Sequence, residues 1–155
     1  MRYAARTLAV ALVTAGSTIA VALLSASRLA DAPVRGRPPV PDALGTLASI
    51  VALCVGLGAF IWLGRSIARD AGPSRAAVIA GALGGTLTGL AGGTAQALAL
   101  ADYLGAVLVG YAVPPEFLAV ALGAYVVLAT IGAAVVGGAI TYLAWDRARG
   151  GRLNR

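Results

Sequence analysis

The side chains that could do chemistry in this sequence are few, and most of them lie at the edges of long apolar stretches. The chain contains no His and a single Cys, Cys54. Zinc sites, His-ligated haem, disulfides within the chain and every His-based triad are therefore excluded. With no nucleophile–base pair, metal-ligand set or phosphate-binding loop in the sequence, we expect no catalytic residue, cofactor or metal site, and hence no enzyme.

One amide and one phenol are the polar groups best placed to meet inside an apolar environment. Gln96 lies about 9 Å along a helix from Asp102, and Tyr125 lies about 13 Å from Glu116, each on the inward side of the acidic residue. Because these depths are comparable, we expect Tyr125 to hydrogen-bond with Gln96 or Thr94, at a net value of about 0.6 kcal/mol. Packing is a simpler role for this contact than substrate binding.

The other candidate residues have simpler interpretations. Asp102 falls at the end of an uncharged stretch, where solvent surrounds it. Glu116 follows two prolines and places a carboxylate at the positive end of a helix dipole. Cys54 lies in the middle of an apolar stretch and is expected to be inert packing.

The elements that must hold these residues are membrane-spanning helices. Of the 155 residues, 59% are hydrophobic and 12% are charged, about half the charged share of a typical soluble domain. A bilayer core about 30 Å thick needs roughly 20 apolar helical residues. Four uncharged stretches reach that length, at 7–27, 43–64, 76–101 and 117–145. The sequence therefore predicts an all-α integral membrane protein, a four-transmembrane-helix bundle forming one domain over residues 1–155.

The charges between these spans predict the orientation. The segments 28–42 and 102–116 are expected outside, and the segment 65–75 and the basic tail 146–155 inside. With the N-terminus inside, nine arginines lie on the inner side and three on the outer side, so both termini are predicted to be cytoplasmic in a multi-pass cell-membrane protein. The inner arginines expected to attract anionic lipid headgroups are Arg65, Arg69, Arg75, Arg147, Arg149 and Arg152.

Helix-ending residues and tryptophan positions agree with this topology, while the fate of the first span and the position of the segment 104–113 stay open. Gly72 and Pro73 are expected to end the helix that passes Arg69, and Trp62 and Trp145 fall at inner interfaces. The first span could instead be a cleaved signal peptide, although its apolar core is longer than usual. The apolar segment 104–113 is too short to cross and is expected to lie in the outer interface or to dip in and return.

The third span differs from the others because small residues repeat along it every four positions. On a helical wheel they gather on one face, with large aliphatic side chains opposite. The residues assigned to helix packing are Ala77, Gly81, Gly84, Gly85, Thr88, Gly89, Gly92 and Gly93. Small residues let helix backbones approach closely, which drives association in lipid. This Gly-rich helix is therefore predicted to be packed at the centre of the bundle.

The partner of this face is left open by the sequence. Span two offers Ala48, Ala52 and Gly56 at matching spacing, and span four offers Ala129, Ala133, Gly137 and Thr141. Packing within the chain is favoured over a homo-oligomer or partner-subunit interface, and a pore lined by backbone and hydroxyls is a further alternative.

These features predict a small polytopic membrane protein with a structural or accessory role, or a subunit of a larger membrane assembly. The alternative is a small oligomeric transporter or channel. The net charge of +6 is spread over the span flanks instead of being gathered on one domain, so no nucleic-acid partner is expected.

Overall fold

The protein is a bundle of four long helices. The computed structural model describes residues 3–29, 43–112, 114 and 116–153, which contain helices and turns and no strand. The helices are α1 (Ala4–Leu29), α2 (Ala43–Arg69), α3 (Ser74–Gly110) and α4 (Glu116–Leu153). Each is long and apolar enough to cross a membrane. The predicted all-helical class with four such helices is confirmed.

The helices extend beyond the predicted spans. The segment 102–110, expected in an outer loop, continues α3, and 146–153 of the expected tail continues α4. Arg and Asp are compatible with a helix interior, and no proline interrupts either stretch, so helical hydrogen bonding continues past the charged residue that ends each uncharged stretch. The apolar residues 104–110, expected to lie separately in the outer interface, are therefore part of α3. Charge counting locates the end of an apolar stretch, not the end of a helix. The expected outer loop 28–42 lies mostly outside the described residues.

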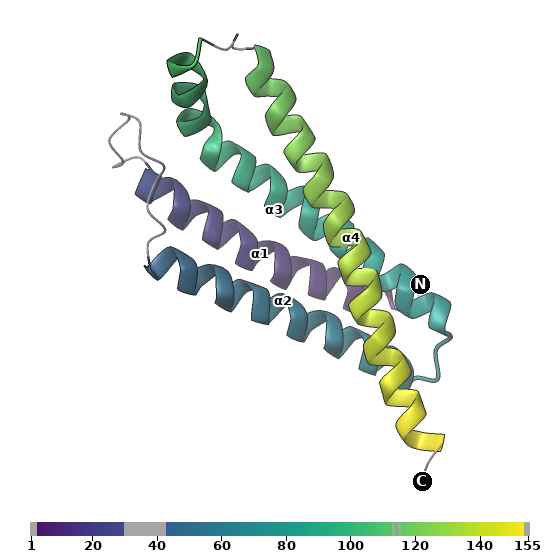
Figure 1. Ribbon diagram of the computed structural model, residues 1–155. Coiled ribbons are helices and arrows are strands. Elements are labelled where there is room, and N and C mark those ends of the chain that lie inside the picture. Colours follow the sequence, from purple (N-terminus) through teal and green to yellow (C-terminus); the bar gives the residue numbers. More distant parts are fainter. Residues whose placement is uncertain (1–2, 30–42, 113, 115, 154–155) are drawn as a thin grey trace.

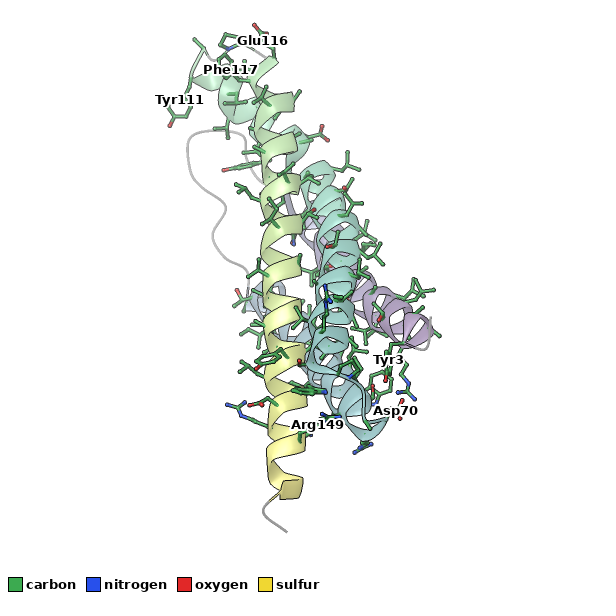
Figure 2. The ribbon with its side chains drawn as sticks, turned by 90° about the vertical axis from the view of Figure 1, so that its right-hand side faces the viewer. Tyr3, Asp70, Tyr111, Glu116, Phe117 and Arg149 are labelled. Atoms are coloured by element: carbon green, nitrogen blue, oxygen red, sulfur yellow. The ribbon has the colours of Figure 1, made fainter. Side chains whose placement is uncertain are left out.

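Each helix contacts at least two others, and only α1 and α4 do not touch among the described residues. α3 packs beside α1 and α4, and α2 packs beside the same two helices on the opposite side. Figure 1 shows the N- and C-terminal ends and the connection between α2 and α3 at one end of the bundle. Tyr3, Asp70 and Arg149 mark this end in Figure 2, while Tyr111 and Glu116 mark the opposite end. We call these the packed end and the open end.

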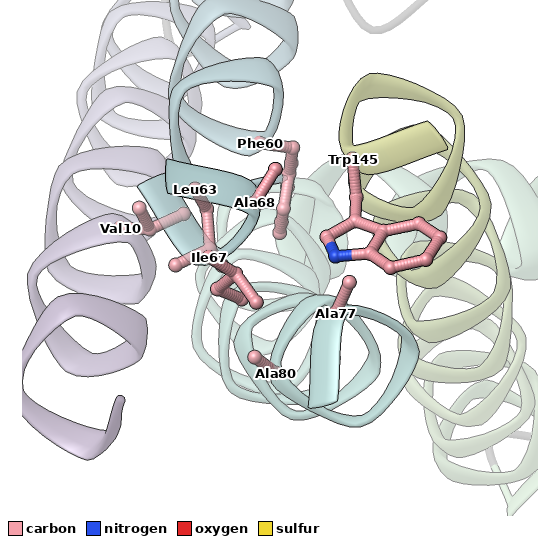
Figure 3. Packing of buried hydrophobic residues seen from close by; sticks show 8 residues of the cluster. All are labelled: Val10, Phe60, Leu63, Ile67, Ala68, Ala77, Ala80 and Trp145. Atoms are coloured by element: carbon pink, nitrogen blue, oxygen red, sulfur yellow. The ribbon is translucent and has the colours of Figure 1, made fainter. Parts of the chain in front are cut away.

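The hydrophobic core lies near the packed end. Figure 3 shows a cluster in which α1, α2, α3 and α4 all take part: Val10, Phe60, Leu63, Ile67, Ala68, Ala77, Ala80 and Trp145. Leu63 and Ile67 have no exposed surface. Toward the open end, α2 has no buried residue before Phe60 and α4 has none before Gly137 among the described residues. One half of the bundle is therefore much more tightly packed than the other.

A Schellman turn closes α2 at the packed end. The Gly72 amide donates to the Ile67 carbonyl at 2.9 Å, and the Ala71 amide donates to the Ala68 carbonyl at 3.2 Å. The left-handed residue is Ala71, with φ of 56°, instead of the glycine usual at this position. Gly72 serves a different purpose, because a Cβ there would lie 2.7 Å from the Ile67 side chain and collide with the Tyr3 hydroxyl.

Candidate functional site

One glycine row of α3 lies directly against the backbone of α4. A Cβ added at Gly85 would overlap the Ala133 carbonyl, and one at Gly89 would lie 2.6 Å from the Thr130 Cα. Gly81 meets Gly137 and Thr141 in the same way, and Gly93 meets the Ala129 side chain. At Gly81, Gly85 and Gly89 these contacts are closer than real Cβ atoms show, so only glycine lets the two backbones touch there, whereas at Gly93 a Cβ would need only a small shift of its neighbour. Of the two rows that offered matching spacing, the one in span four is the partner.

The second row of α3 faces α1 and the aromatic ring of Phe60. A Cβ at Gly84 would lie 3.3 Å from that ring, and one at Gly92 would lie 2.9 Å from the Thr18 Cβ. Between these glycines, the Thr88 and Thr14 hydroxyls share a hydrogen bond across the α1–α3 contact. α3 therefore uses two adjacent small faces, one for each neighbouring helix.

All eight residues assigned to helix packing are buried. α3 contacts all three other helices, while the aliphatic side chains opposite its small faces are open: Ile79, Leu83, Leu87, Leu90 and Leu98 are between 45% and 71% exposed. The small row of α2 is not its partner either. A Cβ at Gly56 would meet only the Thr14 methyl of α1, at 3.9 Å.

The structure brings the predicted amide and phenol together. The Tyr125 hydroxyl donates to Gln96 Oε1 at 2.7 Å, which joins α4 to α3 on the open-end side of the glycine rows. Thr94 does not take part, because its hydroxyl donates to the Leu90 carbonyl of its own helix at 2.7 Å.

At the packed end, α4 and α1 hold the turn between α2 and α3. Trp145 Nε1 donates to the Gly72 carbonyl at 2.9 Å, and Arg149 Nη2 donates to the Ala71 carbonyl at 2.9 Å. The Arg149 guanidinium also lies 4.9 Å from the centre of the Trp145 ring. On the α1 side, Arg6 and Asp70 form an ion pair at 2.6 Å.

This arrangement corrects the expectation for Trp145, which is 9% exposed and is a core residue rather than an interfacial one. The sequence signal was indirect. Gly72 and Pro73 mark the end of α2 in the sequence, and a tryptophan packed beside them can donate a hydrogen bond to the turn. Assigning this role to Trp145 requires knowing that α4 lies beside α2, which the sequence does not show. Trp62, by contrast, is half exposed.

The structure also places Cys54 and the arginines that were expected to attract lipid headgroups. Cys54, expected to be inert packing in the middle of an apolar span, is exposed on α2 and is not part of the buried core. Arg65, Arg69, Arg75 and Arg147 are exposed at the packed end, whereas Arg149 is engaged with the turn. The side chain of Arg152 lies outside the described residues.

A cavity of about 310 Å³ lies between the four helices. The Phe60 ring, which belongs to the hydrophobic core, lines the cavity toward the packed end, at a level where Gly84 of α3 and Gly137 of α4 leave room for the ring. Its walls are mainly apolar and include the side chains of Thr14, Thr18 and Gln96. In the described parts of the chain, no group of three or more His, Cys, Asp or Glu is placed to hold a metal ion.

No protein-family model, curated protein or solved structure matches the chain.

Proposed function

We propose that this chain is a multi-pass integral protein of the cell membrane with a structural or accessory role, such as a subunit of a larger membrane assembly. The observation that carries the proposal is the way small and large residues are divided. The small faces of α3 are covered by α1 and α4, while large aliphatic side chains of α2 and α4 point outward. Ile50, Leu53, Leu128 and Val135 are each more than half exposed.

Such an apolar exterior suits lipid. Soluble proteins rarely expose a contiguous apolar patch larger than a few hundred Å². In a bilayer, lipid tails solvate the same surface at no cost, and helix association depends on close packing instead. The inner glycine contacts and the outer leucine-rich faces are what a membrane-embedded bundle needs.

The charge distribution supports an orientation with both termini in the cytoplasm. Arg6, Arg65, Arg69, Arg75, Arg147 and Arg149 all lie at the packed end, which also holds the described N- and C-terminal ends. Arginine-rich short segments stay on the cytoplasmic side of a membrane. The exposed guanidinium groups there would also attract anionic headgroups.

Topology mapping tests the proposal. A fluorescent protein fused after residue 155 should fluoresce, and alkaline phosphatase inserted within 28–42 should be active, because that segment would be exported. Membrane fractionation should leave the protein in the bilayer after an alkaline wash. Release by the wash, or an active phosphatase at the C-terminus, would contradict the proposal.

The accessory role is tested against the transporter or channel alternative. The cavity favours a conduit, but the Phe60 ring and the core beneath it close it at the packed end. Purified protein in liposomes should therefore leave ion and small-solute gradients intact. Native mass spectrometry should show a monomer, because the small faces are already covered. Sustained flux through the wild-type protein would replace the accessory role with a conduit.

A further inference from the structure

The cavity between the helices is partly open, because Leu53 of α2 and Val136 of α4, which line it, are each more than half exposed. Phe60, which belongs to the hydrophobic core, lines it toward the packed end, and Gln96 of α3 and Ser49 of α2 line it toward the open end. Its volume of about 310 Å³ falls at the lower end of the range for small-molecule sites. None of the described residues that line it is ionisable.

The hydroxyl groups around the cavity already donate hydrogen bonds to backbone carbonyls of their own helices. Ser17 Oγ donates to the Thr14 carbonyl at 2.8 Å, and Thr18 Oγ1 donates to the Ala15 carbonyl at 2.9 Å. Ser49 Oγ donates to the Gly45 carbonyl at 2.9 Å. A buried water needs two to four polar partners, and walls whose donors are satisfied internally hold a chain of water poorly. The body of the cavity is therefore suited to an apolar occupant.

One donor remains at the upper part of the cavity. Gln96 Oε1 accepts the Tyr125 hydroxyl, and no described residue accepts a hydrogen bond from the amide nitrogen of this half-buried side chain. This nitrogen carries two N–H groups. An occupant with an oxygen acceptor at one end would satisfy it, and a charged head would find no counter-charge among the lining residues.

We propose that the cavity binds a single aliphatic chain whose neutral ester carbonyl accepts a hydrogen bond from the Gln96 amide. The chain would extend from Gln96 toward Phe60. The ester could belong to a bilayer lipid or to a free monoacyl ester. This binding site is independent of whether the protein is an accessory subunit, since it depends only on the cavity.

Two glycines of α2 provide a matched pair of variants. A side chain at Gly56 would meet only the Thr14 methyl, at 3.9 Å, so Gly56→Leu would fill the cavity without a backbone clash. A Cβ at Gly58 would have nothing within 4 Å, and Gly58 does not line the cavity. Both variants make the same chemical change on the same helix, two residues apart. Ala52→Leu is a second cavity-filling variant.

Native mass spectrometry of the full chain in detergent, titrated with monoolein, tests the proposal. We expect one bound molecule in the wild type and in Gly58→Leu, and at least a tenfold weaker adduct in Gly56→Leu and Ala52→Leu. Circular dichroism and melting in the same detergent show which variants are folded, and Ala52→Leu decides if Gly56→Leu is not. Equal binding by a folded cavity-filling variant and the wild type, or no saturable adduct in the wild type, would overturn the proposal.

The hydrogen bond is tested separately. Gln96→Leu should weaken monoolein binding about fivefold, the net value of one hydrogen bond. An alkane of the same chain length, which lacks the ester, should bind the wild type and Gln96→Leu equally. Replacing monoolein with dioleoyl phosphatidylcholine, whose head group carries no net charge, distinguishes the two sources: tighter binding assigns the site to a membrane lipid, and weaker binding assigns it to a free ester. If Gln96→Leu binds monoolein as tightly as the wild type, the assigned ester contact is wrong.

Discussion

The two ends of this bundle are built from the same four helices but differ in what lies between them. At the packed end, the main chains of α3 and α4 touch at Gly81 and Gly85, and the turn after α2 is held by Trp145 and Arg149. Toward the open end, no described residue of α3 beyond Ala97 is buried. A cavity separates the helices in the middle.

The difference shows what determines packing where hydrophobic burial gives no advantage. Lipid tails are as apolar as leucine, so an extra leucine between two helices separates them without a compensating gain. Where side chains are absent, van der Waals contact between backbones becomes available, supported by weak Cα–H···O contacts. Stability in this protein should therefore depend on its glycines at the packed end more than on its many large aliphatic residues.

Gly85→Leu should have the largest effect. Its side chain would occupy the position of the Ala133 backbone, so α3 and α4 must separate, at a cost of at least about 3 kcal/mol. Unfolding in mixed micelles measures the loss. Gly132→Leu on α4 is the control, because a Cβ there has nothing within 4 Å. Equal stability of the two variants would show that the glycine row does not hold the helices together.

Trp145→Phe should cost about 1–2 kcal/mol, because it leaves the Gly72 carbonyl without its indole donor. Trp62→Phe changes a half-exposed tryptophan of α2 and should stay within about 0.5 kcal/mol of the wild type. Thermal unfolding followed by circular dichroism gives both values. A larger loss at Trp62 than at Trp145 would reverse the roles given to the two residues.

Thr141→Val should raise stability by about 1 kcal/mol. The Thr141 side chain is fully buried and its hydroxyl has no hydrogen-bond partner, so an isosteric methyl removes a desolvation cost. The same exchange at Thr14 breaks its bond to Thr88 and should lower stability by about 0.6 kcal/mol. Micelle unfolding of both variants tests the opposite signs, and a loss at Thr141 would contradict the account.

Ala71→Gly should produce the smallest change, a gain of about 0.5 kcal/mol. Glycine removes the left-handed strain of about 1–2 kcal/mol but adds disorder to the unfolded chain. Ala112 at the open end has a similar φ of 54°. If the open end unfolds locally before the rest, Ala112→Gly leaves the global midpoint unchanged. Equal gains at both sites would show that the two ends unfold as one unit.

Much of this architecture could be predicted from the spacing of residues. Charges placed 20 or more residues apart predicted four helices, and the four-residue repeat identified Gly81, Gly85 and Gly89 as a packing face. Depth along each helix was enough to suggest the contact between Tyr125 and Gln96. These predictions needed only the geometry of single helices.

The remainder depended on which helices are neighbours. Trp145 caps a turn, Phe60 closes a cavity and Cys54 points outward because α2 lies beside α4 and away from most of α3. The apolar sequences of α2 and α4 are compatible with several arrangements. The bounds of α3 and α4 were underestimated for a separate reason, since a helix can continue beyond the apolar stretch.

A disulfide between α3 and α4 tests the central contact most directly. A Cβ at Gly138 would lie 3.6 Å from the Ala82 Cβ, within the usual range for a disulfide. In a Cys54→Ala background, Ala82→Cys with Gly138→Cys should oxidise to an intramolecular disulfide, seen as a faster-migrating monomer that reverts on reduction. Ala82→Cys with Gly132→Cys should not. A disulfide-linked dimer, or no disulfide at all in the first pair, would contradict direct packing of these helices within one chain.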